Sequence, residues 1–166
     1  YVSTRTAFVV EAKFSNVKKW INQDANSTSK KHLEDLVQRL KVYSILPSDL
    51  SGLVGSHLVS CFVGKGVELG SVSFIETDGD PAKLEEIAFR VAEHKGDSLY
   101  HEFHGDFEIQ MIDIPNLFFG IAPPLIPKGS KTYFTMIDDY LMISDDVDLI
   151  KTFLDDITQE DTWGKS

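Results

Sequence analysis

The stretch KTYFTMIDDYLMISDDVDLIKTFLDDI, residues 131–157, decides the fold, because two strand-like runs and one helix-like run follow one another directly. The strand-like runs are rich in β-branched and aromatic residues and meet at Asp138-Asp139. Two-residue hairpin loops favour Asp because it tolerates positive φ. The helix-like run has one apolar stripe, formed by Leu149, Ile150, Phe153, Leu154 and Ile157. We therefore expect an antiparallel hairpin followed at once by an amphipathic helix.

The aspartates at the start of this helix have a structural explanation. The apolar stripe places the first turn near Asp145 or Asp146, where negative charge complements the helix dipole. Asp145 and Asp148 also have the spacing of a capping box, with Asp in place of the usual Glu. Asp155 and Asp156 lie at the other end of the helix, and neither capping nor the dipole explains them.

A calcium-binding loop is the functional alternative for the same acids. An EF-hand loop needs a glycine at its sixth position and a bidentate glutamate at its twelfth. Counted from Asp146, those positions hold Lys151 and Ile157. The pattern fails at both positions, so we expect no calcium site here.

Two further helices are expected from apolar residues at helical spacing. They lie at residues 30–46 and 81–94. The second begins at Asp80-Pro81, which combines a side-chain acceptor with a residue that has no backbone N–H to leave unsatisfied. Gly96 is expected to end it.

Strand-like segments account for most of the remaining chain. They are expected at residues 5–14, 56–64, 69–78, 98–105, 107–114 and 117–124. The β-branched residues of the first segment place it at the centre of the sheet, and a short helix capped by Ser15 follows it. Strands joined by short turns must be antiparallel, since a parallel crossover needs a longer connection.

Together these segments predict an α+β fold, with an antiparallel sheet of about six to eight strands and about three helices packed mainly on one face. At 166 residues, 42% of them hydrophobic, the chain has the size of a single domain that spans residues 1–166. Tyr1 at the start and the unpatterned TQEDTWGKS at the end lead us to expect a processed protein or a piece of a longer one.

Composition argues against several classes of protein. The net charge of −10 argues against nucleic-acid binding through phosphate contacts, because such binding needs clustered Lys and Arg. No stretch reaches the roughly 18 apolar residues that a membrane-spanning helix requires. The single cysteine, Cys61, lies in the apolar run HLVSCFVG and is expected to be a buried thiol.

The segment HEFHGD, residues 101–106, is the most suggestive of chemistry. A zinc pair on a helix needs histidines four residues apart, whereas His101 and His104 are three apart. The segment also alternates like a strand, so these two side chains are expected on opposite faces. The chain has no GxSxG elbow and no phosphate-binding loop with its strand and helix. We therefore predict no catalytic residue, no metal ligand and no cofactor.

The order of elements resembles that of a known family. The segments TRTAFVVEAKFSNVKKWIN, GSHLVSCFVGKGVELGSVSFIETDGDPAKLEEIAFR, EIQMIDIP and KTYFTMIDDYLMISDDVDLIKTFLDDI are similar in layout to uncharacterised exported bacterial envelope proteins, often lipoproteins of the Bacteroidetes type. The shared features are an opening strand and helix, a hairpin flanked by a helix, and a closing strand that ends in Ile-Ser before a helix. The resemblance implies a location in the periplasm or at the cell surface, within a longer parent protein, and no known activity.

Two functional hypotheses follow. The favoured one is a non-catalytic envelope module that binds another protein, a glycan or a neighbouring domain, with its oligomeric state left open. Loops on a rigid sheet are where binding residues concentrate, which makes HGD and APPLIPKG the contact candidates through His104, Asp106, Pro123, Pro124 and Lys128. The alternative is a hydrolase or metal-dependent enzyme built from His101, Glu102 or Asp106 with acids that the fold brings close.

Overall fold

The closing hairpin and helix form as the sequence predicts. Strand β6 (Thr132–Ile137) pairs with β7 (Tyr140–Ser144) in antiparallel register across a two-residue loop. Asp138 in this loop has a φ of 50°, the left-handed conformation that such turns use. Helix α5 (Val147–Thr158) follows directly and buries four residues of the predicted stripe, Leu149, Ile150, Phe153 and Leu154.

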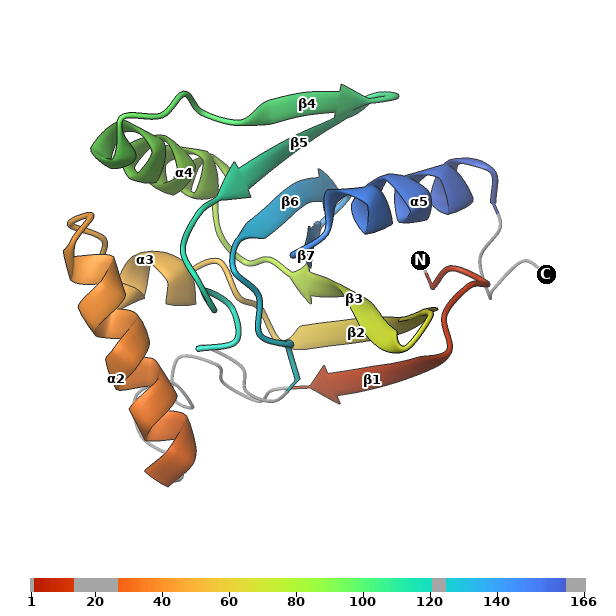
Figure 1. Cartoon of the computed structure of the whole chain (residues 1–166), viewed down its shortest axis with the longest axis horizontal. Coiled ribbons are helices and arrows are strands. Elements are labelled where there is room, and N and C mark those ends of the chain that lie inside the picture. Colours follow the sequence, from red (N-terminus) through yellow and green to blue (C-terminus); the bar gives the residue numbers. More distant parts are fainter. Residues whose placement is uncertain (1, 14–26, 121–124, 161–166) are drawn as a thin grey trace.

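The strands belong to one antiparallel sheet (Figure 1). The computed structural model describes residues 2–13, 27–120 and 125–160, and their seven strands are ordered β1-β2-β3-β7-β6-β5-β4. The remaining strands are β1 (Phe8–Lys13), β2 (His57–Lys65), β3 (Glu68–Glu76), β4 (His101–His104) and β5 (Phe107–Ile112). The described helices before α5 are α2 (Ser27–Lys41), α3 (Pro47–Ser51) and α4 (Ala82–Lys95). This arrangement confirms the α+β fold class.

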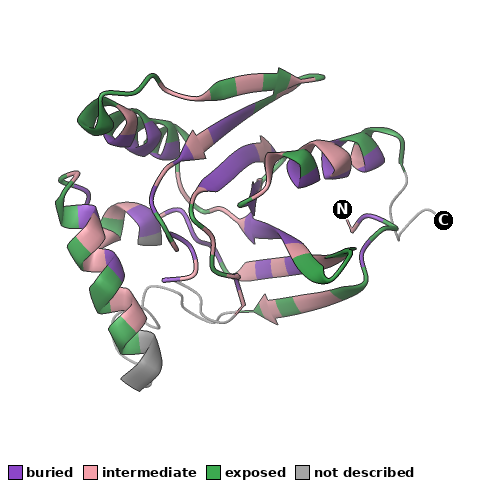
Figure 2. Cartoon of the chain, in the orientation of Figure 1, coloured by how far each residue is buried: buried purple, intermediate pink, exposed green. Residues whose placement is uncertain are grey.

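Each face of the sheet has its own hydrophobic core. Along β7, Leu141 and Ile143 pack into one core and Met142 into the other, because successive side chains of a strand point to opposite faces. Helices α2, α3 and α4 contribute to the first core, and α5 contributes to the second. Figure 2 shows the buried residues in the central strands and along one side of the helices. Three helices therefore share one face, and α5 covers the other.

Several local predictions are confirmed. The backbone N–H of Ala82 donates to Asp80 Oδ1 at 3.0 Å, and Gly96 ends α4 with a φ of 73°. The Cys61 side chain is fully buried, and burial raises the pKa of its thiol to about 11. In the part of the chain that the structure describes, every helix is too short or too polar to cross a membrane.

Other predictions are wrong. Strand β1 lies at an edge of the sheet beside β2, not at its centre. Residues 117–120 form turns, not a strand, and α3 was not expected. The helix expected at residues 15–22 and the end of the strand expected at 117–124 lie outside the described residues.

Candidate functional site

The HEFHGD segment forms the edge strand β4 and its turn into β5, and two of its side chains contact α5. His104 Nε2 lies 2.7 Å from Asp155 Oδ1. Lys151 Nζ lies 2.7 Å from Glu102 Oε1, and the Tyr100 hydroxyl donates to Glu102 Oε2 at 2.8 Å. These contacts fasten the edge strand to the helix.

The electrostatics of these contacts are those of structural ion pairs. The hydrogen bond from Lys151 holds the pKa of Glu102 below its ordinary value, and the same bond raises the pKa of Lys151. Burial raises the pKa of Tyr100 to about 12, and its hydrogen bond to Glu102 adds to the rise. Shifts in these directions move each group away from proton transfer at neutral pH, because an effective acid or base has a pKa near the working pH.

His101 lies on the other face of the sheet, as strand alternation predicts. Its Nδ1 atom is 3.4 Å from Glu108 Oε1, and the residue pairs across the strands with Gln110. Glu102 points toward α5, so His101 and Glu102 are not brought together. Among the described residues, no group of three His, Cys, Asp or Glu side chains is placed to hold a metal ion. Asp106 lines a hollow beside α4.

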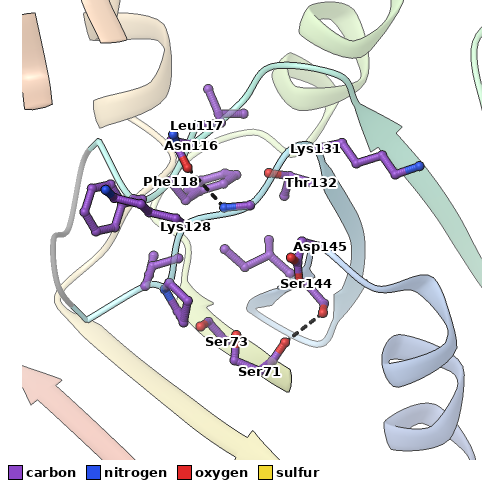
Figure 3. A pocket seen from close by; sticks show the side chains of 15 residues that line it. Ser71, Ser73, Asn116, Leu117, Phe118, Lys128, Lys131, Thr132, Ser144 and Asp145 are labelled. Atoms are coloured by element: carbon purple, nitrogen blue, oxygen red, sulfur yellow. Dashed lines mark hydrogen bonds between the residues drawn. The ribbon is translucent and has the colours of Figure 1, made fainter. Parts of the chain in front are cut away.

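Residues 126–129 of the second predicted contact segment, APPLIPKG, border a small cavity (Figure 3). Pro123 and Pro124 lie outside the described residues, whereas Lys128 lines the cavity. Its volume of about 30 Å³ is room for one small polar group. We call it the loop cavity, because residues 116–119 and 126–129 close it over strands β3 and β7.

Hydrogen-bond donors are prominent in the lining of the loop cavity. The side-chain hydroxyls of Ser71 and Thr132 have no hydrogen-bond partner within the described residues, and neither oxygen is fully buried, so both remain accessible. Asn116 Oδ1 accepts a hydrogen bond from the Gly129 backbone N–H at 3.1 Å, which holds the two halves of the loop together. The amide N–H groups of Asn116 are left to donate. The cavity therefore offers several donors from separate segments of the chain.

Two lysines flank the loop cavity. Lys128 Nζ lies 5.3 Å from the centroid of the Phe119 ring, and Lys131 Nζ lies 5.2 Å from that of Tyr133. Both are cation–π distances. Neither lysine forms an ion pair with a carboxylate of the described residues. In a chain with a net charge of −10, this is a place where positive charge has no direct anionic partner.

Asp145 and Asp146 lie between the loop cavity and α5 and have opposite pKa shifts. Asp146 is the N-cap: its Oδ1 accepts a hydrogen bond from the Asp148 N–H at 2.9 Å, and its Oδ2 pairs with Lys65. Burial opposes its ionisation, but these hydrogen bonds outweigh burial and lower its pKa. Asp145 lines the cavity, and burial, together with the nearby Asp146 carboxylate, raises its pKa. Because Asp146 is the N-cap, the expected capping box of Asp145 with Asp148 is wrong.

Replacement of Asp146 by alanine is expected to lower the free energy of unfolding by about 1–2 kcal/mol at neutral pH, because the helix cap is lost. A lowered folded-state pKa means that this stabilisation is present above the ordinary Asp pKa and is lost as the pH falls through the folded-state value. Asp145→Asn is expected to raise the free energy of unfolding at neutral pH, since a raised pKa means that ionisation disfavours the folded state. Urea unfolding at neutral and acidic pH measures both changes in stability. Equal losses of stability in the two variants would contradict the opposite roles assigned to Asp145 and Asp146.

Sequence reasoning identified Lys128 and missed the other polar groups of the loop cavity. One signal was present, because Ser71 and Ser73 interrupt the apolar middle of β3, and buried hydroxyls need partners. Ser73 Oγ finds one in Ser60 Oγ at 2.7 Å, whereas the Ser71 hydroxyl does not. Asn116 lies in a turn, and only the fold brings its side chain to the cavity.

Comparison with known proteins gave no relatives. No family model, no curated protein and no solved structure matches the chain. The function is therefore inferred from the contacts and charges of the chain itself.

Proposed function

We propose that the chain is a non-catalytic extracytoplasmic module of a bacterial envelope protein, and that it binds a glycan bearing a carboxylate group at the loop cavity. The observation that carries the proposal is the set of donor-bearing residues that line the cavity, Ser71, Thr132 and Asn116, with the Lys128 ammonium at its edge over the Phe119 ring. A carboxylate can accept hydrogen bonds from all of these groups, and the bond from an ammonium is among the strong ones.

The same lining supports binding over catalysis. A nucleophilic hydroxyl needs a base within hydrogen-bond reach. Among the described residues, no hydrogen bond joins the hydroxyl of Ser71 or Thr132 to Asp145 or to a lysine of the lining. The residues of the enzyme hypothesis, His101, Glu102 and Asp106, do not line this cavity. Glu102 is held by Lys151 on the face opposite His101. No observation favours the enzyme over the binding module.

A larger hollow adjoins the loop cavity, because both are lined by Lys131 and Asp145. It has a volume of about 350 Å³ and is also lined by Lys65. The loop cavity has room for one group, so the ring that carries the carboxylate would lie in this open hollow. Asp145 can accept a hydrogen bond from a sugar hydroxyl there.

The proposed location outside the cytoplasm rests on the resemblance in element order to exported envelope proteins. A thiol as buried as that of Cys61, with a raised pKa, is protected from oxidation, which suits such a location.

Titration of the ¹⁵N-labelled chain with glucuronate is expected to shift the backbone amide signals of Asn116, Gly129 and Thr132, and glucose is expected to shift them less. Combining Lys128→Gln with Thr132→Val removes one charged and one neutral donor, so glucuronate should bind about tenfold more weakly. The control Lys83→Gln neutralises an exposed lysine of α4 and should leave the affinity unchanged. If glucuronate leaves the cavity signals unmoved, the ligand class is wrong. Release of a cleavage product from an oligouronide would show that the chain is an enzyme and not a binding module.

A further inference from the structure

A second hollow lies between the start of α4 and strands β5 and β6, and its volume is about 290 Å³. Phe134 and Met136, which face α4, contribute apolar side chains to its lining. The lining also carries the negatively charged carboxylates of Glu85, Asp106 and Glu108. We call it the acidic hollow. It shares no lining residue with the loop cavity.

The charge of the acidic hollow has a single sign. None of the described residues that line it is a lysine, an arginine or a histidine. Glu85 and Asp106 form no ion pair or side-chain hydrogen bond within the described residues, while Glu108 contacts His101 at 3.4 Å. Ala82, at the start of α4, adds the positive end of the helix dipole, which amounts to about half an elementary charge. The carboxylates outweigh it, so the hollow favours a cation.

Gln110 provides an independent indication that a hydrogen-bond donor is missing. Only 7% of its surface is exposed, and its Oε1 has no hydrogen-bond partner among the described residues. Its Nε2 donates to Glu108 Oε1 at 3.4 Å, which orients the amide, because the reverse orientation would turn Oε1 toward a carboxylate. A buried acceptor left without a donor is costly and rare in native structures. Gln110 lines the acidic hollow, so a donor entering there is close to it.

Two exposed phenylalanines lie next to residues that line the acidic hollow, although they do not line it themselves. Phe103, which is 65% exposed, pairs across the strands with Glu108. Phe89, which is 53% exposed, lies one helical turn after Glu85 on α4. Large apolar side chains beside a pocket with charge of one sign are typical of a protein-binding surface.

We propose that the acidic hollow binds a lysine or arginine side chain of a partner protein. Such a side chain combines an apolar stem with a cationic head, which matches an apolar lining that carries carboxylates. Its N–H groups are also the donors that a buried amide oxygen requires. This proposal is independent of the glycan proposal, because the two sites share no residue.

The test is a titration of the ¹⁵N-labelled chain with N-acetyl-arginine methylamide and, in parallel, with the uncharged N-acetyl-citrulline methylamide. The arginine compound is expected to shift the side-chain amide signal of Gln110 and the backbone signals of Glu108 and Thr135. The citrulline compound has nearly the same shape and should shift them little. Equal shifts with both compounds, or none with either, would overturn the proposal without any variant being needed.

Charge-matched variants separate the acidic hollow from the general attraction of cations to a chain with a net charge of −10. The triple variant Glu85→Gln, Asp106→Asn, Glu108→Gln is expected to weaken arginine binding at least about tenfold. Its control carries the same charge change at exposed acids elsewhere, Glu34→Gln, Asp35→Asn and Asp97→Asn, and should bind like the wild type. Equal weakening in the two variants would mean that the attraction is nonspecific. The site variant should lose little stability, because Glu85 and Asp106 form no ion pair within the described residues and the pair of Glu108 with His101 is exposed.

Discussion

Replacing Phe153 by alanine is expected to lower the free energy of unfolding by about 3–5 kcal/mol. Phe153 is fully buried in the middle of α5, and its ring lies 6.3 Å from that of Phe74 on β3. The substitution removes apolar surface and leaves a cavity that its neighbours fill only in part. Urea unfolding followed by circular dichroism measures the change.

The matched control is Phe89→Ala. Phe89 is also a helical phenylalanine, but it is 53% exposed on α4, so its loss is expected to change the free energy of unfolding by less than about 0.5 kcal/mol. A similar small effect for Phe153 would mean that α5 does not seal the second core. Because α5 is the single described helix that contributes to that core, the comparison measures how far the sheet depends on it.

The elements predicted correctly are those with local signals. The hairpin of β6 and β7 has its turn residues and its alternation in one stretch, and α4 has its start and stop residues beside its apolar stripe. The edge position of β1 has no such signal, because β-branched residues indicate a strand but not its neighbours. Its place is set by pairing with β2, more than 40 residues away in register, as Val9 with Cys61 shows.

The segment at residues 117–120 shows how an apolar sequence that is buried as a loop can be mistaken for a strand. Leu117 and Phe118 are buried, and a run of apolar aromatic residues is typical of strands. Here Asn116 turns the chain with a φ of 57°, and the segment fills the first core as a loop. A Cβ added at Gly120 would lie 2.9 Å from Leu36 side-chain atoms, so this glycine permits the close approach of α2. That neighbour is distant in the sequence, and no local pattern reveals it.

At the candidate sites, as in the fold, the sequence predicted some residues and missed others. Lys128 and Asp106 were expected as contact residues because they lie in loops, and each lines a hollow. The groups that give those hollows their chemistry, Ser71, Thr132 and Gln110, lie on strands, where sequence patterns indicate only packing. Their role depends on which residues are left without partners, and that depends on the whole fold.

Asp156→Ala is expected to lower the free energy of unfolding by about 3 kcal/mol. The sequence offers no explanation for this acid at the end of α5, and the fold provides one. Asp156 is 3% exposed, accepts a hydrogen bond from the Ser3 hydroxyl and another from Arg5 Nε at 3.3 Å. It therefore ties the segment before β1 to the last helix. Alanine would leave the buried Ser3 hydroxyl without its partner and Arg5 without its ion pair.

Asp155→Ala provides the matched control, since it removes the same charge from the adjacent position. Asp155 is exposed and contacts His104 at the surface, so its loss is expected to cost less than about 1 kcal/mol. Hydrogen exchange should also separate the variants, because only Asp156→Ala should speed exchange of the amides that join β1 to β2. Equal losses of stability would mean that these acids act through net charge alone. A loss of stability confined to Asp156→Ala would establish that this acid has a structural role. Binding would then be sought at the loop cavity and the acidic hollow, not at these acids.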